Sequence, residues 1–336
     1  MGHQWVINGS SMGHQWVINT RINLLLKNYQ IEKIIVKYEE VNGVLLFNKP
    51  LGLSSNTALQ KVRRLFNAAK AGHTGTLDPL ATGLLPICFG EATKFSSFLL
   101  DGDKEYIATI KLGQTTTTYD AEGEITSTSI VSSTLDEILE CINSFKGTIT
   151  QTPPIYSALK VNGKALYQYA RDGEEVVIKS REICIHEIEL LEYIALDIIK
   201  LRVLSSKGTY IRTLANDIGQ KLGCGAHLIG LVRTKSNQFV LDEKLSLEYI
   251  TSLELQQRRQ LLLPVDIMLS EMPKYELNED DFRYIKNGHS FISSTCNDGE
   301  KICLYRDSQF FGVAKCFKGL VTPVRLMNTS CYHSYA

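Results

Sequence analysis

Apolar residues recur along the chain at the spacings of strands and helices. Residues 43–48 read GVLLFN, a short apolar run that is typical of a buried strand. Residues 104–112 alternate between apolar and polar side chains, which predicts a half-buried strand. The stretches 175–192 and 196–205 alternate in the same way, and their closeness along the chain favours a hairpin or meander.

Three other segments have the apolar spacing of amphipathic helices. The first helix can be capped by Ser54 or Ser55. Its apolar stripe comprises Ala58, Leu59, Val62, Leu65, Phe66 and Ala69. The second begins with a capping box, Thr134 with Glu137, and the third follows Tyr210. Because these helices and strands are interspersed without a strict βαβ rhythm, an α+β fold with a mixed, mainly antiparallel sheet flanked by helices is predicted.

The chain of 336 residues suits a large domain and a small one. Residues 1–8 and 12–19 both read MGHQWVIN, so residues 1–40 are expected to be an artefact or a disordered extension. The main domain is expected over residues 41–255. Residues 273–328 contain two predicted strands around a turn, and we expect a small β-rich domain there.

The formal net charge is zero, but the basic residues are unevenly distributed. Between Glu40 and Asp78 the chain has five basic residues and no acidic one, and residues 207–235 hold five basic residues against one acid. Such segregation can present one positive face to phosphate groups. From charge alone, solvated helix faces are the simpler interpretation.

Eight cysteines are scattered without a C-x-x-C pair, a spacing that opposes a structural zinc site, and no metal site is predicted. Reduced thiols favour a cytoplasmic protein. No apolar run approaches the roughly 20 residues that a membrane-spanning helix needs, so no membrane association is expected.

Residues 72–83, GHTGTLDPLATG, form the most informative motif. Its three glycines permit close backbone approach to a ligand, and Pro79 restricts Asp78 to an extended conformation that directs its carboxylate. Alternatively, Asp78 is an N-cap and Pro79 the first residue of a short helix. The motif has neither the spacing of a phosphate-binding P-loop nor that of a dinucleotide fold.

Two further segments offer side chains for chemistry. Tyr106 lies on the strand predicted at 104–112, where a lone tyrosine more often serves packing. Residues 207–213, KGTYIRT, place Tyr210 and Arg212 at a strand-to-helix junction. An arginine beside Asp78 would keep its carboxylate ionised, although an arginine at a helix start is more often solvated.

Four blocks of sequence, taken together, resemble the TruB family of tRNA pseudouridine synthases. The blocks are residues 43–55, 71–94, 156–171 and 205–228, and the resemblance covers roughly 42–328. The pattern G-H-T-G-x-L-D-P-x-A-x-G in the second block is highly specific. The resemblance implies the pseudouridine synthase fold and favours a functional role for Asp78 over the helix-start interpretation.

The resemblance also implies roles for individual residues. Asp78 is similar to the catalytic nucleophile, Tyr106 to the tyrosine that stacks on the flipped base and accepts a proton, and Arg212 to the arginine paired with the nucleophile. Lys49 matches a lysine that braces the site. The residues that would bind substrate are His73, Tyr210 and Leu231: His73 would insert into the RNA, and the other two would line the uridine pocket.

By the same resemblance, the reaction is the isomerisation of uridine to pseudouridine in the T-loop of tRNA, at position 55 in tRNA numbering. The partner is the T stem-loop, residues 273–328 resemble a PUA-type RNA-binding domain, and the protein is expected to be a monomer. No cofactor is expected, since the isomerisation transfers no electrons and no external group.

Two other functions fit the same sequence. One is a non-catalytic protein that binds or folds tRNA on this scaffold, against which the presence of Asp78, Tyr106 and Arg212 argues. The other is a guide-dependent enzyme that acts on ribosomal RNA within a complex. Residues 115–118 are four threonines, where the family usually has an acid at position 117. The acidic residue nearest to that position along the chain is Asp120.

Overall fold

The structure is a computed structural model that describes residues 38–195 and 197–328. The chain divides into two units, Met1–Tyr38 and Glu39–Ala336, and every element named below belongs to the second. The extension expected over residues 1–40 lies outside the described residues except for its last three positions.

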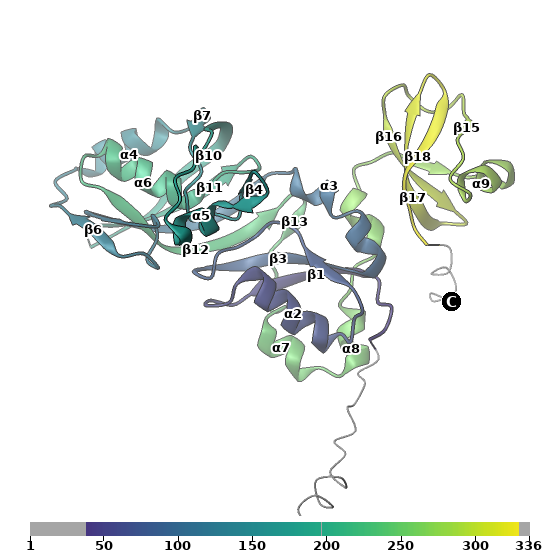
Figure 1. The fold of residues 1–336 in the computed structure, drawn as a ribbon, viewed down its shortest axis with the longest axis horizontal. Coiled ribbons are helices and arrows are strands. Elements are labelled where there is room, and N and C mark those ends of the chain that lie inside the picture. The colour runs from purple at the N-terminus through teal and green to yellow at the C-terminus, as the bar shows by residue number, and fades with distance from the viewer. Residues whose placement is uncertain (1–37, 196, 329–336) are drawn as a thin grey trace, which may run out of the picture. The chain divides into compact units, whose positions relative to one another are not determined.

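The larger sheet has nine strands within the described residues (Figure 1). These strands are β1 (Gly43–Lys49), β2 (Ala71–His73), β3 (Ala81–Phe89), β4 (Lys104–Leu112), β7 (Gly147–Gln151), β10 (Arg181–Ile194), β11 (Ile198–Ser205), β12 (Ala226–Ser236) and β13 (Phe239–Val240). Their order is β1-β3-β12-β4-β11-β10-β7, with β2 beside β3 and β13 beside β12. The β3–β12 pair is parallel and the other pairs are antiparallel. The predicted mixed, mainly antiparallel sheet is confirmed.

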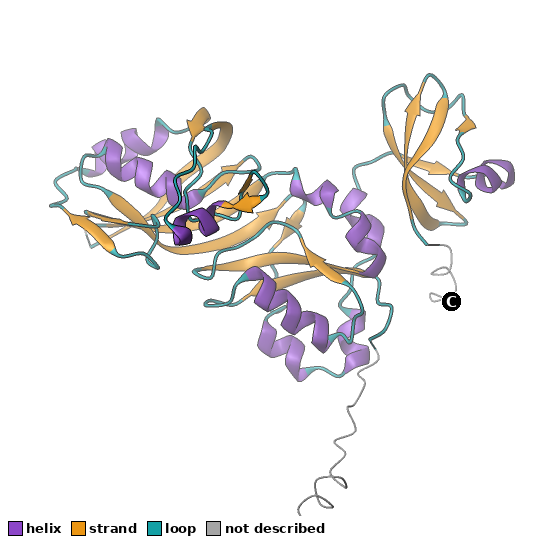
Figure 2. Cartoon of the chain, in the orientation of Figure 1, coloured by secondary structure: helices purple, strands orange, loops and turns teal. Residues whose placement is uncertain are grey.

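Helices flank this sheet (Figure 2). They are α2 (Ser55–Leu65), α3 (Ser97–Leu100), α4 (Leu135–Asn143), α5 (Leu166–Asp172), α6 (Ile211–Lys221), α7 (Leu247–Ser252) and α8 (Leu255–Gln260), with the 3₁₀ turns η1 (Gly90–Lys94) and η2 (Val265–Leu269). Two short hairpins complete this part of the chain: β5 (Gln114–Thr116) with β6 (Ile125–Thr128), and β8 (Lys160–Val161) with β9 (Lys164–Ala165).

Local sequence signals begin and end these helices. The Ser54 hydroxyl accepts a hydrogen bond from the Thr57 amide at 3.1 Å, so Ser54 is the cap of α2. The capping box predicted at Thr134 is present at the start of α4. Helix α2 ends at Leu65 because Asn67 adopts a left-handed backbone with φ of 51°, and the predicted stripe is therefore wrong in its last residue, Ala69, which is exposed.

The apolar faces of α2, α4 and α6 contribute to a buried cluster together with the strands of the larger sheet. Phe66 and Phe89 meet within it, with ring centroids 4.9 Å apart. Each fully buried side chain of this size contributes roughly 1.5–3 kcal/mol, so the sheet gives a rigid base to the loops at its edges.

A second sheet occupies the C-terminal part of the chain. It has the order β14-β16-β17-β18-β15. Its elements are β14 (Lys274–Glu276), β15 (Phe291–Ile292), β16 (Lys301–Arg306), β17 (Gln309–Phe317), β18 (Leu320–Leu326) and α9 (Glu279–Ile285). They enclose a small apolar cluster of their own. The strands expected on either side of the turn at 307–308 are thus present.

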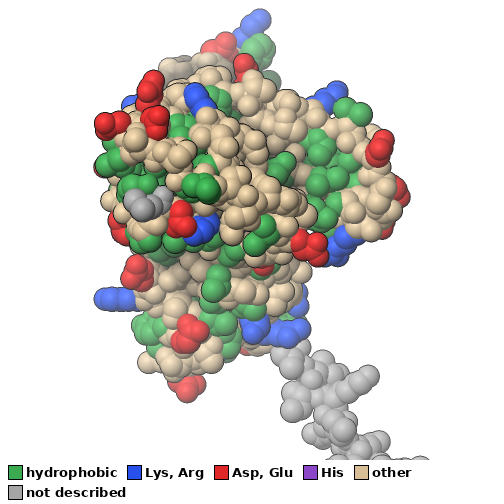
Figure 3. All heavy atoms as spheres, turned by 90° about the vertical axis from the view of Figure 1, so that its left-hand side faces the viewer, with side chains coloured by type: hydrophobic (Ala, Val, Ile, Leu, Met, Phe, Trp, Pro, Cys, Tyr) green, Lys and Arg blue, Asp and Glu red, His purple; other side chains and the backbone are tan. Residues whose placement is uncertain are grey.

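Charged side chains are interspersed on the face shown in Figure 3, where no continuous basic stripe is visible among the described residues. None of the described helices is both long enough and apolar enough to cross a membrane.

Candidate active site

The glycine-rich motif includes the end of β2, the loop 74–80 and the start of β3, and Asp78 lies in this loop. Gly75 has φ of +75°, a backbone conformation that favours glycine. The amide of Ala81 donates to the carbonyl of Asp78 at 3.0 Å, which closes a turn, and β3 begins at Ala81. No helix follows Asp78, so the alternative interpretation of Asp78 and Pro79 as a helix start is wrong.

Ser55 fixes the residue just before Asp78. Its side chain is buried, and its hydroxyl both accepts from the Leu77 amide and donates to the Leu77 carbonyl, each at 2.8 Å. The first turn of α2 therefore anchors the backbone that carries the carboxylate.

Replacement of Ser55 by alanine is expected to destabilise the fold by about 1–3 kcal/mol, since two buried backbone groups of Leu77 lose their partner. It should also lower kcat more than it raises KM, because Asp78 loses its support. Ser54→Ala is the matched control: it removes the helix cap, at about 1 kcal/mol, and leaves Leu77 untouched. Urea denaturation and steady-state assays of both variants measure this difference, and equal kcat values would contradict the anchoring role.

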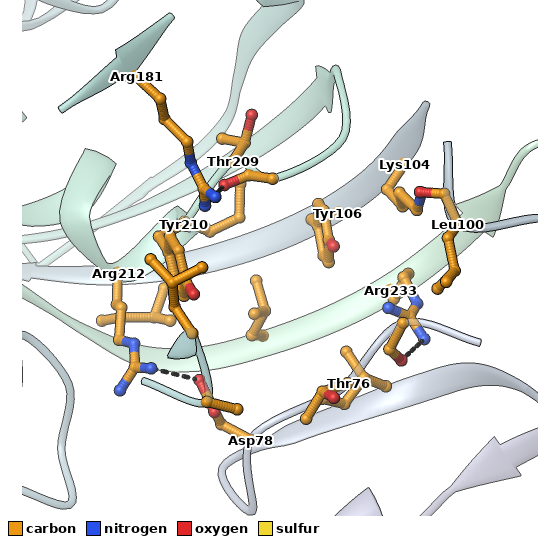
Figure 4. Close-up of a pocket in the computed structure, with 18 residues that line it drawn as sticks. Thr76, Asp78, Leu100, Lys104, Tyr106, Arg181, Thr209, Tyr210, Arg212 and Arg233 are labelled. Atoms are coloured by element: carbon orange, nitrogen blue, oxygen red, sulfur yellow. Dashed lines mark hydrogen bonds and ion pairs between the residues drawn. The ribbon is translucent and has the colours of Figure 1, made fainter. Parts of the chain in front are cut away.

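A cavity of about 360 Å³ opens beside Asp78 (Figure 4). Five of the residues singled out in the sequence line it: Asp78, Tyr106, Tyr210, Arg212 and Leu231. They come from the loop before β3, from β4, from the start of α6 and from β12. Tyr106 is 9% exposed and pairs across the sheet with Val203 of β11 and Arg233 of β12, so its ring is fixed in the wall of the cavity.

Arg212 links two carboxylates at the base of the cavity. It is 6% exposed, and its two terminal nitrogens lie 3.3 Å from Asp78 Oδ2 and 3.4 Å from Asp120 Oδ2. The nitrogen near Asp78 also donates to the Tyr156 carbonyl at 2.8 Å. Asp120 is 2% exposed and accepts from the Glu122 amide at 3.0 Å. Its carboxylate is therefore fixed in place and in turn fixes the guanidinium of Arg212.

The pKa of Asp78 is raised from its usual value. Burial is the main cause, and the negative charge of Asp120 adds to it, whereas Arg212 and Lys49 oppose it. The Asp78 side chain nevertheless retains 41% exposure, so its carboxylate is open to a substrate in the cavity while one oxygen is paired with the Arg212 guanidinium. A carboxylate of this kind is suited to nucleophilic attack.

Lys49 and His73 are not among the residues that line the cavity. Lys49 is fully buried, and its ammonium donates to the carbonyls of Pro50 and Leu53 at 2.9 and 2.6 Å. Burial lowers the pKa of Lys49 to about 8. Lys49 thus holds the turn before α2, and its role in the site stays a prediction. His73 lies on β2, and burial together with Arg233 lowers its pKa.

Four charged residues of the site were not singled out from the sequence as site residues: Lys104, Asp120, Arg181 and Arg233. Arg233 is 1% exposed and donates from Nε to the Leu84 carbonyl at 2.7 Å. Lys104, Arg181 and Arg233 line the cavity with Arg212, against the single carboxylate of Asp78. The cavity wall is therefore cationic, as a site for a polyanion requires. The basic stretch 207–235 contains Arg233 and could have indicated it. Lys104, Asp120 and Arg181 lie outside that stretch.

No group of histidine, cysteine and acidic side chains in the described part of the chain is arranged to hold a metal ion.

Sequence comparison accounts for most of the chain. Residues 63–211 match the N-terminal domain of TruB family pseudouridylate synthases, and residues 212–270 match the tRNA pseudouridylate synthase B C-terminal domain. The tRNA pseudouridine synthase B of Aromatoleum aromaticum is 47% identical over 290 residues, which are 86% of this chain and 94% of the relative. That of Francisella philomiragia is 48% identical over 296 residues, 88% of this chain and 97% of the relative.

Solved structures show the same fold. The chain is similar to a structure described as a Cbf5-Nop10-Gar1 complex, with a TM-score of 0.65 and 25% identity over 88% of this chain and 87% of that chain. Another similar structure is described as an H/ACA RNP bound to a substrate RNA, with a TM-score of 0.64 and 22% identity over 91% of this chain and 90% of that chain. The chain therefore belongs to the TruB family of pseudouridylate synthases, enzymes of the isomerase class.

Proposed function

We propose that this chain isomerises uridine to pseudouridine at position 55, in the T-loop of tRNA, with Asp78 as the nucleophile. The observation that carries the proposal is the Asp78 carboxylate held by Arg212 at the base of a cationic cavity whose wall includes Tyr106. The names of the relatives, tRNA pseudouridine synthase B, support tRNA as the substrate.

The reaction breaks the C1′–N1 bond of the nucleoside, turns the uracil and rejoins it to C1′ through C5. An ionised carboxylate can attack the nucleoside covalently and so divide one difficult step into two. The proton lost from C5 balances the proton gained at N1, and no external group is needed. Because the target base is stacked in the RNA, it must first be extruded, at a cost of a few kcal/mol that aromatic contacts offset. Tyr106 offers a ring in the cavity for that contact.

In this proposal the other residues bind and position the substrate. Tyr210 and Leu231 line the pocket for the uridine, and Lys49 braces the turn beside it. His73 contacts the RNA from β2. The β-rich segment 273–328 serves as a PUA-like RNA-binding domain. The protein acts as a monomer in the cytoplasm.

Tyr106→Phe is expected to keep the ring and lose about a hundredfold in kcat, because general acid–base groups contribute 10²–10⁴-fold. The KM for tRNA should change little, since the stacking surface remains. Single-turnover assays with excess enzyme measure the loss. A rate equal to that of the unmodified chain would remove Tyr106 from the role of proton acceptor.

Incubation of the purified chain with an unmodified tRNA transcript, followed by chemical mapping of pseudouridine, tests the function. We expect modification of the T-loop uridine without added RNA or protein. A transcript that is bound but unmodified would support the non-catalytic alternative. Activity that appears only with a guide RNA and partner proteins would support the ribosomal RNA alternative.

A further inference from the structure

Arg181 is held against the cavity by the loop that carries Tyr210. It is the first residue of β10, it lines the cavity, and one of its terminal nitrogens donates to the Gly208 carbonyl. Gly208 has φ of +84°, and a Cβ at this position would lie 3.2 Å from the guanidinium carbon. The guanidinium therefore packs directly on the glycine backbone, and a side chain at residue 208 would displace it.

The ring of Tyr210 lies near two guanidinium groups, with Arg181 5.1 Å and Arg212 5.8 Å from its centroid (Figure 4). Gln151, the cross-strand partner of Arg181, holds the backbone of Tyr210 on both sides: it accepts from the amide at 2.8 Å and donates to the carbonyl at 3.1 Å. The ends of β7 and β10 are thus attached to the start of α6, and Arg181 is fixed relative to Arg212.

The two arginines differ in their charge partners. Arg212 is paired with Asp78 and Asp120. Arg181 makes no ion pair with an acidic residue in the described part of the chain, and its buried Nε has no hydrogen-bond partner there. A guanidinium fixed in a cavity wall without an anion retains donors for one, and its planar fork matches the oxygens of a phosphate.

We propose that Arg181 binds a backbone phosphate that flanks the extruded nucleotide and thereby positions that nucleotide over Asp78. This inference rests on the proposed function, because it takes RNA as the ligand. Arg212 is occupied by carboxylates. Of the other cations that line the cavity, Lys104 is 8% exposed and Arg233 1% exposed, whereas Arg181 is half-buried, so Arg181 is the one most open to a phosphate. Arg181 is a positioning residue and takes no part in bond making.

A double-mutant cycle between protein and RNA tests the contact. Arg181→Gln removes the charge, and a neutral methylphosphonate, placed in turn at each phosphate around the target uridine of a T-arm stem-loop, removes the anion. With the unsubstituted enzyme, a methylphosphonate at one of these positions should lower kcat/KM about ten- to a hundredfold, as expected for a lost hydrogen bond between charged groups. With Arg181→Gln, the same methylphosphonate should cause no further loss, because the contact is already absent.

Lys146→Gln is the matched control, since Lys146 is exposed and does not line the cavity; it should retain the full methylphosphonate effect. Arg181→Lys should recover part of the activity and keep the salt dependence. Arg181→Gln should make the slope of log affinity against log salt shallower by about 0.7, the value for one phosphate of a single strand. The proposal would be overturned if the losses from Arg181→Gln and from the methylphosphonate were additive at every position and the salt dependence of affinity were unchanged. Arg181 would then only support the backbone at Gly208. Failure of the proposed function is distinct: the unsubstituted enzyme would then form no pseudouridine in the natural stem-loop.

Discussion

Asp78→Asn is expected to lower the rate of pseudouridine formation by at least about a thousandfold, since loss of a nucleophile removes the covalent step. Asparagine has the size of aspartate but no charged oxygen to attack with. Binding of tRNA should persist, because the cationic residues that line the cavity are unchanged. Release of tritium from C5-labelled uridine measures turnover, and filter binding measures the affinity for tRNA.

The stability of this variant separates lost chemistry from lost folding. Because the pKa of Asp78 is raised in the folded state, mainly by burial, its ionised form opposes folding at neutral pH. The neutral amide avoids this cost, so the melting temperature should not fall. Glu140→Gln, at an exposed carboxylate of α4 that does not line the cavity, is the control and should match the unsubstituted chain in turnover, tRNA binding and melting temperature. Turnover within tenfold of normal for Asp78→Asn would exclude Asp78 as the nucleophile.

The fold could be predicted wherever the signal is local. The strand at 104–112, the capping box at Thr134 and the hairpin formed by β10 and β11 each depend on side chains close together in sequence. The early end of α2 was missed because the left-handed backbone of Asn67 has no strong signal in the sequence. Pairing of β12 with both β3 and β4 joins segments about 120–150 residues apart, and no periodicity specifies such partners.

The site residues also differ in whether a local sequence signal identifies them. Asp78, Tyr106 and Arg212 lie in motifs that can be recognised, whereas Asp120 and Arg181 become site residues only through tertiary contacts. Asp120 enters by a bridge to Leu228 and an ion pair with a residue 92 positions away. Arg181 enters because β10 pairs with β7 beside Tyr210. Neither has a neighbouring sequence pattern that distinguishes it from an ordinary surface charge.

Arg212→Met is expected to lower kcat by about a thousandfold, because removal of a single charge-stabilising donor costs 10²–10³-fold and Arg212 also positions the nucleophile. The substitution leaves Asp78 and Asp120 facing each other without a cation between them. Since Asp120 is almost fully buried, stability should fall by about 3 kcal/mol at neutral pH. Assays must therefore be run well below the melting temperature of the variant, as monitored by circular dichroism.

The pH profile distinguishes the electrostatic role of Arg212 from a merely structural one. Arg212 is the largest influence that lowers the pKa of Asp78, so its removal should raise that pKa and move the acid limb of kcat/KM to higher pH. Asp120→Asn should do the opposite, because the charge of Asp120 raises the pKa of Asp78. Arg212→Lys keeps a cation, so it should move the acid limb of the kcat/KM profile back towards the pH at which it lies in the unsubstituted enzyme. Shifts of the same sign in Arg212→Met and Asp120→Asn would show that the limb does not report Asp78, and the carboxylate at the base of the cavity would lose its assignment.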